Sequence, residues 1–380
     1  MQYTPDQLIR LAKRDNNKIR PYLFVNPLQG KHIPADPGDV IGLCRSIAAK
    51  INGLYPDELL YVIGFAETAT GIASCITSYL KNAVYYQSTT REHNGEKCIL
   101  FSETHSHATE QLLREEGIED ALKSVDRVVF IDDEVTTGNT ILNLISMIKD
   151  RCHDTDLHYS VVSIINSMPE GRIDELFQQD IDCVYLVHIP FEYKKESIID
   201  IEFAPENHIT VRDDCETKPD MEFVCSVNSR NIVPVSNYIS AVGRFAEEIR
   251  TCLPDGGKCM DKVLVLGTEE FMYPTFVVGE MIQQHGRAKT VKIHSTTRSP
   301  IIASNKAGYP LRRRYQIRSP YDSERTTYIY NLDRYDKVFV LTDAPDHSAG
   351  LNDLRKALEL SGNMDISVVR WKYTEGGEVI

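Results

Sequence analysis

The segment Val128-Val129-Phe130-Ile131-Asp132-Asp133-Glu134-Val135-Thr136-Thr137-Gly138-Asn139-Thr140 gives the clearest indication of the fold. Its first four residues are apolar and predict a buried β-strand. Two adjacent carboxylates follow at the carboxyl end of this strand, and then a short loop of small, hydroxylated residues. The apolar periodicity of residues 141–148 predicts a helix after the loop. A strand, a loop and a helix in this order are typical of a parallel α/β sheet.

The loop of this segment has the composition of a phosphate site. Backbone N–H groups at the N-terminus of a helix attract anions, the threonines add hydroxyl donors, and the glycine lets the backbone approach the anion closely. The candidate phosphate-binding residues are Thr136, Thr137, Gly138, Asn139 and Thr140.

The acid pair suits a different part of the same ligand. Asp132 and Asp133 can accept hydrogen bonds from two neighbouring ribose hydroxyls, directly or through Mg²⁺ and its waters. A phosphate site beside a site for a diol and a metal indicates a sugar phosphate. The alternative is a solvated acidic loop in which Thr137 or Asn139 only caps the helix.

Composition limits the class of protein. The chain has 380 residues, enough for about two domains. Its net charge of -13 argues against a general nucleic-acid or membrane-surface binder, because such proteins need a basic surface. The nine cysteines form no CxxC pair, the first residues do not resemble a signal peptide, and no apolar run is long enough to span a membrane. We therefore expect a cytoplasmic protein with reduced thiols.

The pattern around this segment extends the α/β reading. Five β-rich runs alternate with helical segments between residues 59 and 189, which predicts a doubly wound parallel sheet with ligands at the carboxyl ends of its strands. Arg91 ends one of these strands, and its planar guanidinium suits phosphate oxygens. A surface ion pair is the alternative for Arg91. Residues 4–16 predict a short N-terminal helix that begins at Thr4 and Pro5.

The segment at 128–140 resembles the signature of type I phosphoribosyltransferases, which binds 5-phosphoribosyl 1-pyrophosphate (PRPP). The resemblance implies that Asp132, Asp133 and Glu134 belong to the catalytic centre, with Mg²⁺ at Asp132 and Asp133. It also implies a pyrophosphate loop after the first core strand. That loop corresponds here to Ala66, Glu67 and Thr68.

Two further segments acquire roles through this resemblance. A mobile loop of the family closes over the transition state, and here it contains His105 and His107, which could donate to the leaving pyrophosphate or move a proton. A metal site at these histidines is the weaker alternative. A variable hood of the family binds the acceptor, and the loop with Lys31 and His32 is our candidate for it. A plain surface loop is the other interpretation.

The second half of the chain repeats features of the first. Ser295-Thr296-Thr297-Arg298 follows a predicted strand, as Ser88-Thr89-Thr90-Arg91 does. We infer a second Rossmann-like α/β domain that is a degenerate copy of the first. Chance similarity between two α/β domains is the alternative. We predict a phosphoribosyltransferase domain with its hood at 1–205, a linker at 206–235 and the second domain at 236–380.

The second domain lacks the acid pair and the TTGNT loop, so we do not expect it to bind PRPP in the same way. Its strand end retains a candidate anion site at Thr297, Arg298 and Ser299. Five arginines lie among tyrosines at 308–325, and we expect this insertion to be a loop that faces a substrate, rather than a solvated face.

As a whole, the chain resembles the bacterial two-domain phosphoribosyltransferase–TRSP family, which is associated with tellurium-resistance and stress operons. The residues behind this resemblance are the PRPP signature, the GKHIP loop, the HSH loop, TTRSP and the VLTD strand. It implies Mg²⁺-dependent transfer from PRPP to an unknown acceptor, giving a nucleotide or nucleoside-like metabolite. We expect a homodimer that binds neither membranes nor nucleic acid.

One departure from the family bears on the acceptor. Purine-salvage members often have an acidic general base two residues before the signature glycine, where this chain has Thr136. Glu134, Glu103 or His105 could replace that base, or the nucleophile needs none. The second hypothesis is a PRPP-binding regulatory protein without turnover. A third is that the second domain acts on the same metabolite as a hydrolase or transferase.

Overall fold

The protein is described from a computed structural model. It covers residues 3–15, 20–93, 95–101, 110–151, 156–190, 201, 204, 207–211, 218–251, 253, 259–345, 349–375 and 378–379. The chain forms two compact units. Unit 1 contains Met1–Pro5, Gly42–Glu192 and Val227–Ala241, and unit 2 contains Asp6–Ile41, Tyr193–Ser226 and Val242–Ile380. This division differs from the predicted domains, because residues 6–41 and 193–226 group with the second unit.

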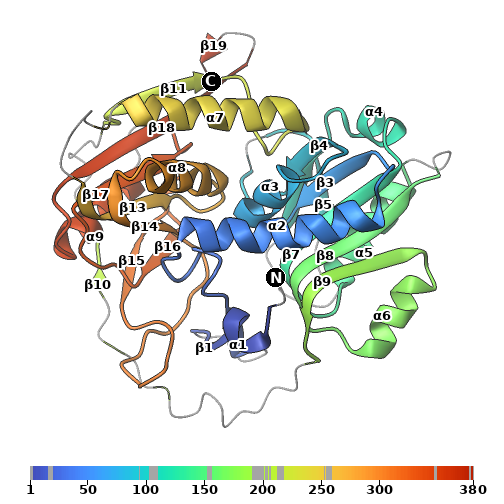
Figure 1. Cartoon of the computed structure of the whole chain (residues 1–380), viewed down its shortest axis with the longest axis horizontal. Helices are drawn as coiled ribbons and strands as arrows, with labels where there is room; N and C mark the ends of the chain where they lie inside the picture. The colour runs from blue at the N-terminus through green and yellow to red at the C-terminus, as the bar shows by residue number, and fades with distance from the viewer. Residues whose placement is uncertain are drawn as a thin grey trace. The chain divides into compact units, whose positions relative to one another are not determined.

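Unit 1 is built on a six-stranded sheet with the order β12-β4-β3-β7-β8-β9. Figure 1 labels β4, β3, β7, β8 and β9 of this sheet. The five strands from β4 to β9 in this order are parallel, and the short β12 pairs antiparallel with β4. The strands are β3 (Leu60–Gly64), β4 (Ala83–Ser88), β7 (Arg127–Val135), β8 (His158–Asn166), β9 (Ile181–His188) and β12 (Val233–Pro234). The predicted parallel α/β sheet is confirmed.

The helices and the hairpin of unit 1 connect these strands. A hairpin of β5 (Cys98–Phe101) and β6 (Gln111–Arg114) lies in sequence between β4 and β7. The helices are α3 (Thr70–Thr77), α4 (Ile118–Lys123), α5 (Asn139–Lys149) and α6 (Glu170–Phe177). Residues 128–131 of β7 are fully buried because helices and strands cover both faces of a parallel sheet, which explains their uninterrupted apolar sequence.

Unit 2 contains a second parallel sheet, with the order β11-β18-β17-β13-β14. Its strands are β11 (Met221–Cys225), β13 (Met260–Gly267), β14 (Ala288–Ser295), β17 (Lys337–Thr342) and β18 (Ile366–Glu375), and β19 (Glu378–Val379) pairs antiparallel with β18. The helices α8 (Tyr273–Gln284) and α9 (Ala349–Leu360) follow β13 and β17. The longer helices α2 (Pro37–Leu54) and α7 (Val235–Thr251) each contain a point of division between the units.

Two smaller sheets complete the described part of unit 2. One joins β10 (Asn207–His208), β15 (Arg314–Arg318) and β16 (Thr326–Tyr330). The other is the antiparallel pair of β1 (Arg10–Lys13) and β2 (Tyr22–Val25). Within residues 206–235, which we predicted as a linker, the described residues form β10, β11 and β12.

Two predicted elements are wrong. The helix expected at 4–16 is only one turn long, α1 (Pro5–Leu8), because residues 10–13 pair with β2 as strand β1. The insertion at 308–325 is only partly a loop, because residues 314–318 form β15 between β10 and β16. Among the described residues, none of the helices has the length and apolar character needed to cross a bilayer.

Candidate active site

The acid pair lies within strand β7 rather than after it. Gly64, the last residue of β3, is paired with Ile131, so β7 continues for four residues beyond its neighbour, to Val135. Only β8 accompanies this extension, with Asp132 opposite Ser163. The two carboxylates are therefore held on a rigid strand at the carboxyl edge of the sheet, where ligands of parallel sheets bind.

The predicted pyrophosphate loop lies beside these carboxylates. After Gly64 the chain turns, and the Phe65 N–H donates to the Ile131 carbonyl at 3.0 Å. The Thr68 hydroxyl then donates to Asp133 Oδ1 at 2.7 Å. The structure therefore brings together two segments that are 65 residues apart in sequence.

The end of β4 supports the same loop. The Ala66 N–H donates to the Thr89 hydroxyl oxygen at 2.7 Å, and Glu67 is buried. Arg91 follows Thr89 by two residues and is half-buried. Ala66, Glu67, Thr68 and Arg91 thus all come from loops at the carboxyl ends of β3 and β4, and Thr68 is the one with a hydrogen bond to the acid pair on β7 described above.

The acid pair is electrostatically unfavourable without a ligand. Burial, and then the negative charge of Asp133, raise the pKa of the Asp132 carboxyl well above its usual range. The Asp133 N–H donates to Asp132 Oδ1 at 2.9 Å and partly offsets this effect. A cation or a hydroxyl donor would relieve the repulsion, which is the property expected of a site for a diol or a metal.

This raised pKa predicts how stability depends on pH. The native state holds the Asp132 proton more tightly than the unfolded chain does, so its contribution to stability is complete at low pH and is lost as the pH rises through the folded-state pKa. We expect Asp132→Asn, which cannot ionise, to become increasingly more stable than the wild type as the pH rises above the ordinary aspartate pKa of about 4. Thermal melting without added metal, over this range, tests it. A constant difference between the two proteins would contradict the assignment.

The candidate phosphate loop has the geometry of a helix start. Gly138 precedes α5 with a left-handed backbone (φ 72°), and its carbonyl accepts from the Leu142 N–H at 2.9 Å. The Thr137 hydroxyl oxygen accepts from the Asn139 N–H at 3.3 Å. A Cβ on Gly138 would lie 3.3 Å from Met168 Sδ, so the loop is closely packed on the segment after β8. Thr137 and Asn139 are exposed, and Thr136 and Thr140 are half-buried.

One residue of this site was not predicted. Arg172, in the first turn of α6, donates through Nε to the Thr137 carbonyl at 3.2 Å and through an NH2 group to Asn139 Oδ1 at 2.9 Å. It also pairs with Glu175 at 2.7 Å. The available signal was that β7 and β8 are consecutive parallel strands, because the helices that follow such strands begin side by side. Arg172 places a cation against the backbone of the phosphate loop.

The remaining predicted residues have different environments. His105 and His107 lie outside the described residues. Lys31 and His32 are buried within unit 2, where Lys31 Nζ donates to the Glu269 carbonyl at 2.5 Å. The burial of both side chains argues against the plain surface loop, and Lys31 supports the loop after β13. The role of this loop as a hood for the acceptor stays a prediction.

The predicted anion site of unit 2 is already occupied by protein carboxylates. Thr297 is buried, and Ser299 is half-buried. Arg298 Nε lies 2.6 Å from Glu269 Oε2, and an NH2 group of Arg298 lies 3.7 Å from Glu270 Oε1. Three of the five arginines at 308–325 also form ion pairs within unit 2. Arg314 pairs with Asp15, Arg318 with Asp353 and Arg325 with Glu269.

Comparison with protein families gives two matches. A family model described as a phosphoribosyl transferase matches residues 8–189. A second model, described as the TRSP domain C-terminal to that transferase domain, matches residues 235–358. No curated protein sequence matches the chain.

The solved structures that match part of the chain include several phosphoribosyltransferases. The adenine phosphoribosyltransferase of Trypanosoma brucei, in complex with AMP, pyrophosphate and ribose-5-phosphate, is 17% identical, and the match covers 48% of this chain and 77% of that chain with a TM-score of 0.35. The adenine phosphoribosyltransferase of Rhodothermus marinus is 13% identical, and the match covers 48% of this chain and 96% of that chain with a TM-score of 0.35. A hypoxanthine phosphoribosyltransferase of Staphylococcus aureus is 16% identical, and the match covers 36% of this chain and 66% of that chain with a TM-score of 0.26. Similarities this distant carry no information about the substrate.

Proposed function

The chain belongs to the family in which a phosphoribosyl transferase domain is followed by a TRSP domain, and from this premise we propose that unit 1 transfers the phosphoribosyl group of PRPP to a nucleophile, with release of pyrophosphate. The observation that carries the proposal is the hydrogen bond between Thr68 and Asp133. It joins the candidate pyrophosphate loop to the candidate ribose carboxylates, so both ends of the breaking bond have binding groups in one place.

Magnesium fits this set of donors. Mg²⁺ usually binds to one or two carboxylates and completes its shell with water and substrate phosphates. Across the described ranges, no group of three or more His, Cys, Asp or Glu side chains is arranged to hold a metal ion. Asp132 and Asp133 alone are sufficient for this mode of binding, and the raised pKa of Asp132 marks a place where positive charge is favoured. When bound, Mg²⁺ would neutralise charge on the leaving pyrophosphate.

The reaction balances as a substitution at C1 of the ribose. The nucleophile forms a bond to C1, the bond between C1 and the pyrophosphate oxygen breaks, and that oxygen keeps the electron pair. A proton that the nucleophile loses passes to a general base or to water. Asp132 and Asp133 hold the ribose hydroxyls, and Arg91 and the backbone of residues 66–68 bind the pyrophosphate. The loop 136–140 holds the 5-phosphate, which fixes the position of C1 relative to the nucleophile.

The residue at position 136 bears on the identity of the acceptor. Thr136 replaces the acid that serves purine-salvage relatives as a general base, so we propose a nucleophile other than an ordinary purine. Glu134, next to the acid pair on β7, is half-buried. Of the three candidates for a replacement base, it is the one that lies among the described residues. The product would be a nucleotide or nucleoside-like metabolite.

Pyrophosphate release from PRPP with Mg²⁺, measured across a panel of nucleobases and small amines, tests the proposal. We expect release that depends on the acceptor and stops when Mg²⁺ is chelated. If PRPP binds but no member of a broad panel releases pyrophosphate, the chain would instead be a PRPP-binding regulatory protein without turnover.

Arg172 should contribute to phosphate binding. We expect Arg172→Ala to weaken binding of ribose 5-phosphate about three- to tenfold, because a charge-assisted contact to an exposed loop is lost. Titration calorimetry measures this change. Arg151→Ala is the matched control, because Arg151 also donates to a backbone carbonyl, that of Met147, and pairs with a glutamate, Glu115, away from the loop. Equal effects of the two variants would refute the role of Arg172.

A further inference from the structure

Unit 2 repeats the strand arrangement of unit 1. The parallel order β4-β3-β7-β8 corresponds to β14-β13-β17-β18. In each unit the second and third of these strands along the chain are separated by an antiparallel hairpin, which is β5-β6 in unit 1 and β15-β16 in unit 2. The correspondence therefore includes the insertion as well as the sheet.

Strand registers give the equivalent residues. Gly64 is paired with Ser88 and Ile131, and Gly267 is paired with Ser295 and Leu341. Counting from these pairs, Arg298 is equivalent to Arg91, and Asp343 is equivalent to Asp133. The register therefore shows which carboxylate of the acid pair has a counterpart in unit 2.

The hydrogen bonds around the first loop are also equivalent. The Thr89 N–H donates to the Gly64 carbonyl at 2.8 Å, and the Thr296 N–H donates to the Gly267 carbonyl at 3.1 Å. The Glu269 N–H donates to the Thr296 hydroxyl oxygen at 2.9 Å, as the Ala66 N–H does to that of Thr89. Glu269 therefore stands in unit 2 where the pyrophosphate loop of unit 1 has Ala66.

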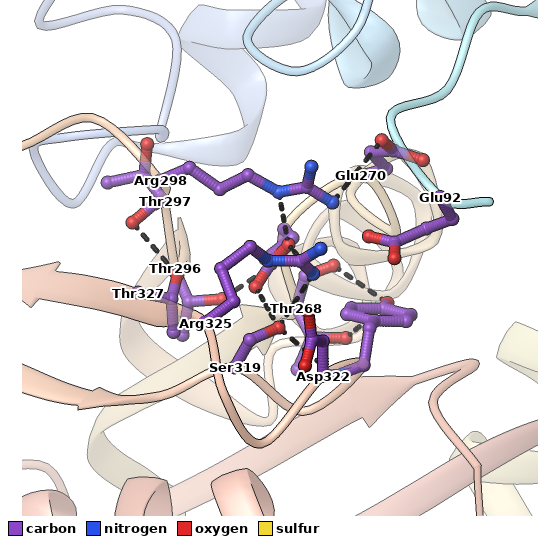
Figure 2. A network of polar contacts seen from close by, with 12 residues as sticks. Glu92, Thr268, Glu270, Thr296, Thr297, Arg298, Ser319, Asp322, Arg325 and Thr327 are labelled. Atoms are coloured by element: carbon purple, nitrogen blue, oxygen red, sulfur yellow. Dashed lines mark hydrogen bonds and ion pairs between the residues drawn. The ribbon is translucent and has the colours of Figure 1, made fainter. Parts of the chain in front are cut away.

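The Glu269 carboxylate is fully buried and binds cations of its own unit. Its Oε2 lies 2.6 Å from Arg298 Nε and 3.0 Å from an NH2 group of Arg325, and its Oε1 accepts from the Ser319 hydroxyl at 2.6 Å. We call Glu269, Arg298, Ser319 and Arg325 the strand-end cluster. Figure 2 shows Arg298, Arg325 and Ser319 pointing into the same small region.

The start of α9, which is the described part of the segment equivalent to the 5-phosphate loop, also packs against the protein. A Cβ on Gly350, in the first turn of α9, would lie 2.4 Å from the carbonyl carbon and oxygen of Ser319. The backbone of Ser319 thus packs against the start of α9. Arg318 fixes this contact, because its Nε donates to Asp353, a buried residue in the same helix, at 2.8 Å. The described first turn of α9 is therefore covered by protein backbone at Gly350.

We infer that the anion site of unit 2 is closed from within, with the Glu269 carboxylate in the place that corresponds to the leaving pyrophosphate in unit 1. Two guanidinium groups normally attract phosphate, but here they are neutralised by buried Glu269 and Glu270. An added anion would have to displace a carboxylate that already has short, charge-assisted contacts. Arg298 therefore stabilises unit 2, and the binding and reaction of PRPP belong to unit 1.

The single tryptophan makes this inference testable on the full chain. Trp371 lies buried in β18, in contact with Phe223 and Phe245 of unit 2, so its fluorescence reports the unfolding of that unit. Melting is followed in sodium acetate and in sodium chloride of equal ionic strength. Acetate is the probe because it replaces the carboxylate that Glu269→Ala removes.

We expect Glu269→Ala to melt below the wild type, and acetate to raise its melting temperature by roughly 2–4 °C more than chloride does. Glu269→Ala/Arg298→Ala should lose this response. The wild type should melt alike in both salts. A folded Glu269→Ala that does not respond to acetate would overturn the inference.

A second comparison does not depend on the folding of Glu269→Ala. Inorganic phosphate should change the melting of unit 2 equally in the wild type and in Arg298→Ala, because the native strand-end cluster is closed. A stabilisation by phosphate that is present in the wild type and lost in Arg298→Ala would show an open anion site and contradict the inference.

Discussion

Asp133→Asn should lower pyrophosphate release from PRPP by about a thousandfold, the order of loss expected when a group that stabilises transition-state charge is removed. Asp133 accepts a hydrogen bond from the Thr68 hydroxyl and, in our proposal, binds the ribose and Mg²⁺. Asparagine retains the size of the side chain and its ability to accept that hydrogen bond, so the loss would come from the charge. Steady-state release with Mg²⁺ measures it.

The control for this variant is Asp180→Asn. Asp180 is exposed, belongs to unit 1 and has a left-handed backbone (φ 57°) that asparagine also adopts readily. It loses the same charge without touching the site, so its release rate should stay within about twofold of the wild type. If Asp133→Asn also keeps the wild-type rate, the acid pair has no part in the reaction.

Gly138→Ala should weaken PRPP binding by roughly ten- to a hundredfold, because a small displacement of the loop misplaces the groups that hold the 5-phosphate. Gly138 has a left-handed backbone, and a Cβ there would press on Met168 Sδ at 3.3 Å. Alanine would also cost about 1–2 kcal/mol of stability through backbone strain. Calorimetric titration with PRPP measures the affinity, and thermal melting measures the strain.

Gly117→Ala separates these two effects. Gly117 precedes α4 as Gly138 precedes α5, with φ 78° against 72°, and the nearest atom to a Cβ there is Ile232 Cδ1 at 3.9 Å. Both alanine variants should therefore lose similar stability, but only Gly138→Ala should lose PRPP affinity. Equal affinities in the two variants would remove the loop 136–140 from the binding site.

Much of the fold of unit 1 could be predicted from the sequence. The apolar run at 128–131 and the alternation of strands and helices predicted the parallel sheet, because burial on both faces leaves a direct mark on composition. Local sequence patterns do not show which distant segments pair as strands. Residues 10–13 look helical on their own and become a strand only because β2 lies beside them.

Less of unit 2 could be predicted from the sequence, again because its contacts join residues that are distant in sequence. The charge of Arg298 was visible in the sequence, and an anion site was a reasonable prediction from it. Its partner Glu269 is 29 residues away, and the strand register alone shows that this glutamate replaces an alanine of unit 1. The burial of Lys31 could not be predicted for a similar reason, since it follows from a contact with the loop after β13, which is distant in sequence.

The most direct test of the whole account is calorimetric titration of the full chain with PRPP in the presence of Mg²⁺. We predict saturable binding of a single PRPP per chain, which Asp133→Asn greatly weakens and Arg298→Ala leaves in place. A chain that binds no PRPP, or one whose binding depends on Arg298 rather than on Asp133, would contradict the assignment of the site to the end of β7.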